Sequence, residues 1–192
     1  MKDKNELNKL NKLNNKKYGV YVGRFCPLHI NHEKIIRELI KDFGYDGSLV
    51  VIGSSNAPLT KRNIFTYSDR KGFIKKLFPD VRVTGMPDFG NVPRWLEAFD
   101  DMLNLAGMTP DNTLYYGGSK EDLDYFIHDR RDVLIFDRMS GDKGGLSATK
   151  VREYLKCGEE REITKTINPM LIKEVKDIFK IRRRELIETE AK

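Results

Sequence analysis

The chain has 192 residues, of which 39% are hydrophobic and 33% are charged, and its formal net charge is +6. This size and composition are typical of one soluble globular domain, and they exclude a membrane protein because no apolar run reaches the length of a transmembrane helix. The two cysteines, Cys26 and Cys157, are too few for a disulfide framework. We therefore expect a protein of the reducing cytoplasm.

The positive charge lies mainly at the two ends of the chain. Residues 1–17 carry a net charge of +4 and residues 180–192 a net charge of +2, so the middle is close to neutral. Basic ends of this kind are usually solvated, which argues against a nucleic-acid-binding protein. We predict a flexible basic tail over residues 1–17 and a single domain over residues 18–192. Three leucines at every third position of the tail leave open a weak helix docked on a second subunit, and with it a homo-oligomer.

The first strong pattern begins with an apolar, β-branched run at residues 20–22, which predicts a buried strand. A proline-containing loop follows, and apolar residues then repeat at helical spacing over residues 33–40. The loop brings Arg24, His29 and His32 to the start of this helix. Unpaired N–H groups and the helix dipole favour an anion there, so the segment predicts a phosphate site.

The rest of the chain alternates between strand-like and helical segments. We predict further strands over residues 48–52, 81–84, 112–116 and 133–136. We predict helices over residues 67–78, from Trp95 to Leu103, over 119–127, from Ser147 onward, and over 168–187. A charged, glycine-rich loop at residues 137–145 is predicted to be mobile. This alternation predicts a Rossmann-like α/β fold, with an open five-stranded parallel sheet and helices on both faces.

The helix that opens at Ser147 provides a second anion site. Ser147 is its predicted N-cap, and the hydroxyl of Thr149 and the guanidinium of Arg152 lie in its first turns. An isolated histidine at a helix start is commonly only a cap. Two histidines without a nearby cysteine or third carboxylate also make a poor zinc site. The second anion site therefore favours a different hypothesis, that one polyphosphate is held between the two helix starts.

The runs Gly23-Arg-Phe-x-Pro-x-His29-x-x-His32 and Ser147-x-Thr149-x-x-Arg152 together resemble the paired motifs of the HxGH nucleotidyltransferase superfamily. Two further runs, Val51-Ile-Gly-Ser-Ser55 and Asn63-Ile-Phe-Thr-x-x-x-Arg70, are similar to segments of archaeal-type nicotinamide mononucleotide (NMN) adenylyltransferases. The resemblance extends over residues 18–175. It implies an enzyme that transfers AMP from ATP to NMN, giving NAD and pyrophosphate, with Mg²⁺ accompanying the ATP.

The resemblance also implies roles for individual residues. We expect His29, His32 and Arg152 to be catalytic, because they would donate to phosphate oxygens in the transition state. The residues expected to bind ATP lie in the two motifs or at the end of a strand: Gly23, Arg24, Phe25, His29, His32, Gly117, Ser147, Thr149 and Arg152. The residues expected to bind the acceptor follow the second and third strands: Arg62, Asp88, Asn91 and Trp95. No side chain is expected to bind a metal directly.

Three positions differ from the family pattern: Asn31 replaces the glycine between the histidines, Ala148 replaces a glycine of the second motif, and Ile64 replaces a proline. Asn31 leaves open a homologue that binds nucleotide without turnover. The resemblance also leaves open adenylyl or cytidylyl transfer to another phosphate acceptor, such as pantetheine phosphate or flavin mononucleotide. Trp95 favours NMN, although a core aromatic on a helix is an equal interpretation of this residue.

Overall fold

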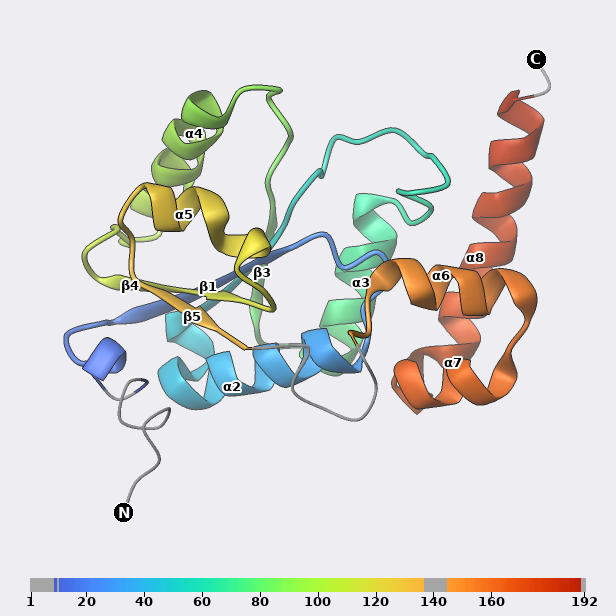
Figure 1. The fold of residues 1–192 in the computed structure, drawn as a ribbon, viewed down its shortest axis with the longest axis horizontal. Coiled ribbons are helices and arrows are strands. Elements are labelled where there is room, and N and C mark those ends of the chain that lie inside the picture. The colour runs from blue at the N-terminus through green and yellow to red at the C-terminus, as the bar shows by residue number, and fades with distance from the viewer. Residues whose placement is uncertain (1–8, 10, 137–144, 191–192) are drawn as a thin grey trace.

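The centre of the molecule is a five-stranded parallel sheet with strand order β3-β2-β1-β4-β5 (Figure 1). The computed structural model describes residues 9, 11–136 and 145–190. The strands are β1 (Tyr18–Gly23), β2 (Ser48–Ile52), β3 (Arg82–Gly85), β4 (Thr113–Gly117) and β5 (Val133–Ile135). All four strand pairings are parallel, which confirms the predicted sheet.

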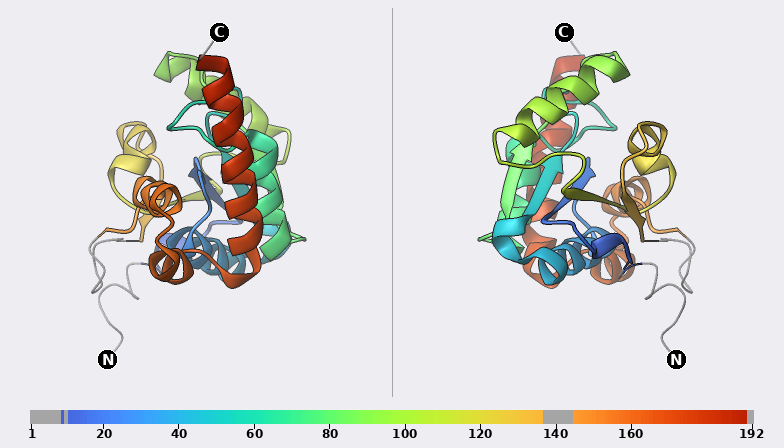
Figure 2. Two further views of the ribbon diagram at one scale, coloured as in Figure 1. Left: turned by 90° about the vertical axis from the view of Figure 1, so that its right-hand side faces the viewer. Right: turned by 90° about the vertical axis from the view of Figure 1, so that its left-hand side faces the viewer.

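Helices cover both faces of this sheet, as predicted (Figures 1 and 2). They are α2 (Ile30–Gly47), α3 (Tyr67–Leu77), α4 (Val92–Asn104), the 3₁₀ turn η1 (Glu121–Leu123), α5 (Asp124–His128), α6 (Ala148–Cys157), α7 (Glu160–Thr166) and α8 (Pro169–Glu190). The predicted C-terminal helix is therefore present as α8. Within the described residues, no helix combines the length and the apolar composition needed to cross a membrane.

The core consists of two apolar clusters, one on each face of the sheet. Successive side chains of a strand point to opposite faces, so Tyr21 of β1 packs with α2, α3 and α8, whereas Val20 packs with α4 and α5. All five residues of β2 and all five of β4 are buried. Burial on both faces explains why these strands are apolar runs without polar alternation.

Two helices differ from the sequence prediction. Helix α4 begins at Val92, before the predicted start at Trp95, because Asn91 caps it and a proline occupies its first turn. Helix α7 was not predicted, since it has only seven residues and most of them are charged or polar. The predicted mobile loop lies outside the described residues, apart from Gly145.

The described part of the predicted tail contacts the domain. Lys9 lies 2.8 Å from the carboxylate of Asp42 in α2, and the ammonium of Lys12 donates to the carbonyl of Val133 in β5 at 2.7 Å. Lys12 therefore lies beside the edge strand β5, and the flexibility of the tail stays a prediction. The first eight residues of the tail lie outside the described residues.

The close packing of Gly117 can be tested by adding a methyl group. Gly117→Ala is expected to lower the free energy of unfolding by about 1–3 kcal/mol, because an added β-carbon would lie 2.4 Å from Cγ of Leu123. Gly72→Ala on α3 is the matched control. Its β-carbon would meet no atom within 4 Å, and alanine there is expected to raise stability by about 0.5–1 kcal/mol. Chemical denaturation followed by circular dichroism measures both changes, and undiminished stability of Gly117→Ala would contradict the packing argument.

Candidate functional site

The predicted site residues gather at the carboxyl edge of the sheet. Strand β1 lies between β2 and β4, so the strand order reverses beside it, and open α/β sheets bind ligands at such a point. The loop after β1 leads from Arg24 into α2 at this edge. The sheet topology therefore places the first predicted motif where a ligand is expected.

The loop after β1 is held by the ring of Phe25, whose backbone is left-handed with φ of +50°. The ring packs edge-on against Tyr21 at 5.1 Å and against His32 at 5.0 Å between centroids. A β-carbon at Gly23 would lie 2.9 Å from the tip of this ring, so Gly23 leaves room for it. The side chain of Phe25 is buried, and any contact of Phe25 with a nucleotide would involve its backbone.

The side chain of His32 caps the start of α2 and stacks on His29. The backbone N–H of His29 donates to Nδ1 of His32 at 3.3 Å, and the two rings stack with centroids 3.6 Å apart. His29 is 0% exposed and His32 is 7% exposed, so His32 is the more accessible of the two. Because Nδ1 of His32 accepts a hydrogen bond, the neutral ring carries its proton on Nε2, which is a donor.

The second motif meets the first through Arg152. The hydroxyl of Ser147 accepts from the backbone N–H of Lys150 and caps α6, as predicted. The guanidinium of Arg152 donates to the carbonyl of Cys26 at 2.8 Å and to the hydroxyl of Thr149 at 3.0 Å. The structure therefore brings the starts of α2 and α6 together, on which the polyphosphate hypothesis depends.

Three arginines place positive charge at this edge. Partial burial lowers the pKa of Arg24, and the positive charges of Arg62 and Arg152 lower it further. Partial burial and the charge of Arg62 likewise lower the pKa of Arg152. The thiol of Cys26 donates to the carbonyl of Arg62 at 3.6 Å, which connects the loop of Arg62 to the loop after β1. Since the guanidinium groups stay charged and repel one another, an anion bound among them would be stabilised.

Among the residues predicted to bind the acceptor, Arg62 lies in the loop after β2, Asp88 and Asn91 lie between β3 and α4, and Trp95 lies in the first turn of α4. The backbone of Asp88 makes two hydrogen bonds with the side-chain amide of Asn56, and the Asp88 carboxylate offsets part of the burial and charge repulsion that lower the pKa of Arg24. Asn91 caps α4 by accepting from the backbone N–H of Arg94 at 3.0 Å. Trp95 is half-buried and stacks on Phe99 with centroids 4.9 Å apart. Asn91 and Trp95 therefore have structural roles in α4, and their roles in binding stay predictions.

Arg70 lies directly beneath the loops of the site, and its motif in the sequence did not predict this role. It is 2% exposed, and its guanidinium donates to the carbonyls of Arg24, Gly53 and Ser54. A signal was present in the sequence, because Thr66 and Asp69 form a capping box that fixes the start of α3. That cap places the next residue, Arg70, in the first turn of a helix at the ligand edge.

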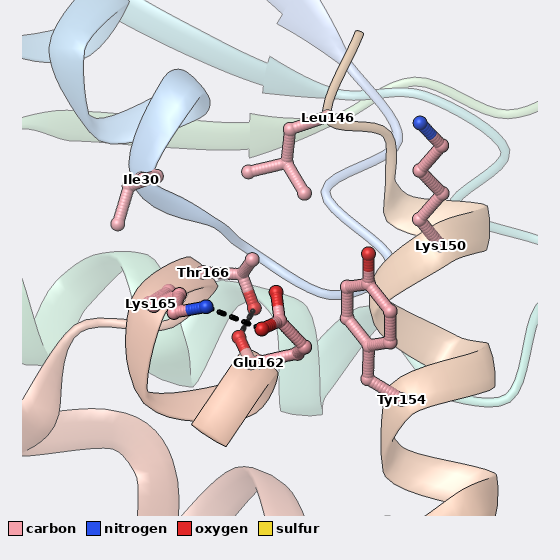
Figure 3. A pocket seen from close by; sticks show the side chains of 7 residues that line it. All are labelled: Ile30, Leu146, Lys150, Tyr154, Glu162, Lys165 and Thr166. Carbon is pink, nitrogen blue, oxygen red and sulfur yellow. Dashed lines mark hydrogen bonds and ion pairs between the residues drawn. The ribbon is translucent and has the colours of Figure 1, made fainter. Parts of the chain in front are cut away.

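A pocket of about 210 Å³ lies beside the site and borders a different face of α6 (Figure 3). Lys150 and Tyr154, one turn apart, face this pocket, whereas Thr149 and Arg152 lie on the face toward Cys26. Its lining residues are Ile30, Leu146, Lys150, Tyr154, Glu162, Lys165 and Thr166. The pocket therefore adjoins the converging helix starts without including the three arginines.

The family model for cytidylyltransferase-like proteins matches residues 20–154 of the chain. The chain belongs to this family. The match includes both motifs, from Gly23 to Arg152, and so confirms the predicted superfamily. This cytidylyltransferase-like chain is 25% identical over 174 residues to the nicotinamide-nucleotide adenylyltransferase of Thermococcus kodakarensis, a similarity that covers 86% of this chain and 87% of that protein.

Solved structures of nucleotidyltransferases share the fold. The bifunctional NMN adenylyltransferase/ADP ribose pyrophosphatase of Francisella tularensis aligns with a TM-score of 0.63 and 19% identity, over 74% of this chain and 43% of that chain. A second structure of the Francisella protein contains AMP and a manganese ion. A NadR protein in complex with NAD and AMP-PNP aligns with a TM-score of 0.59 and 21% identity, over 81% of this chain and 46% of that chain. The chain thus spans less than half of either solved protein, and the alignments confirm the nucleotidyltransferase fold.

The anion site can be tested without an acceptor or turnover. Arg152→Gln is expected to weaken the binding of inorganic tripolyphosphate by about tenfold or more, since it removes a positive charge that would contact the anion. Isothermal titration calorimetry measures this affinity. Lys156→Gln is the control, because Lys156 is exposed near the end of the same helix, and we expect a change of no more than about twofold. Equal losses in the two variants would show that the net charge, and not this site, attracts the anion.

Proposed function

We propose that this chain transfers the adenylyl group of ATP to nicotinamide mononucleotide, giving NAD and pyrophosphate. The observation that carries the proposal is the hydrogen bond between Arg152 and the carbonyl of Cys26, which unites the two motifs. Membership of the cytidylyltransferase-like family and the similarity to a nicotinamide-nucleotide adenylyltransferase support the same reaction.

The reaction needs positioning and charge more than it needs a base. The acceptor phosphate is already an anion; one of its oxygens attacks the α-phosphorus of ATP. The bond to the bridging oxygen then breaks, and pyrophosphate leaves with that electron pair. Two mutually repelling anions must be held in line while charge builds on the α-phosphate. In this chain, three groups of donors are proposed to stabilise that charge: the backbone N–H groups at the start of α2, the Nε2–H of His32 and the guanidinium of Arg152.

Mg²⁺ bound to the triphosphate would neutralise part of its negative charge. Among the described residues, no group of three histidine, cysteine, aspartate or glutamate side chains is placed to bind a metal. The side chains at the site are mainly cationic, so they fit a triphosphate that brings its own divalent ion. The manganese ion in the related Francisella structure supports a divalent ion in this role, and Mg²⁺ is our specific proposal.

The acceptor is proposed to lie between the arginines and α4. Arg62 would contact the acceptor phosphate, Asp88 and Asn91 would recognise the carboxamide, and the exposed part of Trp95 would contact the nicotinamide ring. The half-burial of Trp95 and its position beside Asn91 at the start of α4 support this arrangement. Cytoplasmic location, the absence of a nucleic-acid partner and a homo-oligomer stay predictions.

The proposal is tested by a screen of acceptors. Pure protein is incubated with ATP, Mg²⁺ and one of four acceptors: NMN, nicotinate mononucleotide, pantetheine phosphate or flavin mononucleotide. We expect pyrophosphate release with NMN and the appearance of NAD, which mass spectrometry identifies. Binding of ATP with no pyrophosphate from any acceptor would instead support a homologue without turnover, and release with another acceptor alone would reassign the substrate.

The role of His32 provides a second test. His32→Ala is expected to lower kcat by about 10²–10³-fold, because it removes a donor that acts on charge developing in the transition state. His128→Ala is the control, since the His128 side chain is 79% exposed on α5 and is expected to leave kcat unchanged. Melting temperatures of both variants are compared, because His32 also caps α2. An unchanged rate for a folded His32→Ala protein would remove this residue from the mechanism.

A further inference from the structure

Arg70 is a buried charged side chain whose described hydrogen bonds go to backbone carbonyls. Its Nη1 donates to the carbonyls of Arg24 at 2.9 Å and Gly53 at 2.8 Å. Its Nη2 donates to Ser54 at 3.0 Å, and its Nε donates to Thr66 at 3.3 Å. These carbonyls belong to the loop after β1, the loop after β2 and the residue before α3. One guanidinium therefore fixes three segments at the ligand edge of the sheet.

Two of these bonds adjoin residues with unusual backbone angles. Phe25, directly after Arg24, has φ of +50°, and Ser54 also has φ of +50°. Residues other than glycine rarely adopt this left-handed region, and they do so where the surrounding structure holds them there. Arg70 binds the carbonyl at the peptide bond that precedes Phe25 and the carbonyl of Ser54 itself. The backbone on which the site is built thus depends on Arg70 at two strained points.

Arg70 is in turn connected to the C-terminal helix through Asp69. The carboxylate of Asp69 accepts from the backbone N–H of Thr66 at 2.8 Å and so completes the cap of α3. Arg182 of α8 donates to both oxygens of the same carboxylate at 2.9 Å. The Asp69 side chain is only 9% exposed, which limits screening of this ion pair by water. Helix α8 therefore holds the first turn of α3 in place, and Arg70 directly follows Asp69 there.

We infer that Arg70 is a positioning residue for the nucleotide site and that the Asp69–Arg182 pair keeps it in place. By fixing the carbonyls of Arg24 and Ser54, Arg70 determines how the Arg24 side chain and the loop after β2 meet the triphosphate. Lysine is a poor replacement, because one ammonium lacks the planar fork of donors that reaches several carbonyls at once. This inference rests on the proposed function for its catalytic consequence, whereas its effect on anion binding is independent of turnover.

Two kinds of measurement test the inference, namely steady-state kinetics with ATP and NMN and calorimetry with inorganic tripolyphosphate. Arg70→Lys is expected to raise both the KM for ATP and the Kd for tripolyphosphate by about tenfold or more, and to lower kcat about 10–100-fold, since small misplacements at a transfer site have large effects. The KM for NMN should change less. Arg182→Gln is expected to shift the same quantities in the same direction by about two- to fivefold. Arg184→Gln, exposed on the same helix, is the matched control and should match the wild type.

The outcomes separate a positioning role from a purely structural one. If folded Arg70→Lys and Arg182→Gln melt at lower temperature but bind tripolyphosphate as the wild type does, the inference is overturned. If Arg70→Lys fails to fold, Arg182→Gln decides by the same criterion. A wild-type protein that binds tripolyphosphate but makes no NAD would refute the proposed function alone, because the binding measurements would still test Arg70.

Discussion

The hydrogen bond from the guanidinium of Arg152 to the carbonyl of Cys26 is the contact on which the candidate site depends. It joins α6 to the loop after β1 across 126 positions of sequence, and so places two helix N-termini at one edge of the sheet. Each N-terminus alone offers a few N–H groups and a partial positive charge, which is a weak and unspecific anion site. A polyphosphate has several charged groups along its length, so it can contact the N-termini of α2 and α6 at the same time.

The charges around this contact have separate functions. Burial is the main cause of the lowered pKa values of Arg24 and Arg152, and repulsion among the charges of Arg24, Arg62 and Arg152 lowers them further. A bound polyanion would relieve this repulsion, and binding should therefore weaken as salt screens the charges. Arg70 lies beneath them, and its guanidinium donates to backbone carbonyls, so it adds a further positive charge to the site. Arg70 thus organises the backbone of the loops that carry Arg24 and Arg62.

Much of the fold could be predicted from the sequence, because the central strands are apolar runs and the long helices have clear apolar periodicity. Helix α7 could not, since a short charged segment has no such pattern and is helical only in contact with the rest of the core. The contacts of Lys9 and Lys12 were also missed, because a run of lysines has the same composition whether it is solvated or paired.

The charged residues of the candidate site could be predicted from the sequence. The backbone geometry that positions them could not. The contact between the two motifs, made by Arg152 and Cys26, followed from two patterns that each have their own helix start. The burial of Phe25 and the role of Arg70 could not be predicted. A left-handed backbone at Phe25 and hydrogen bonds from Arg70 to carbonyls do not require a recognisable pattern of residue types. The packing of Gly117 against Leu123 likewise offers a reason for that glycine that the motif did not suggest.

The stacking of Trp95 on Phe99 has a practical consequence, because Trp95 is the only tryptophan in the chain. Tryptophan fluorescence of the unlabelled protein therefore originates at one place, the start of α4. A pyridinium ring close to that indole would quench its emission by electron transfer, so occupancy of this region can be followed optically. The same indole rests on the apolar cluster of α4 and α5, and its emission would also report the loosening of that half of the core.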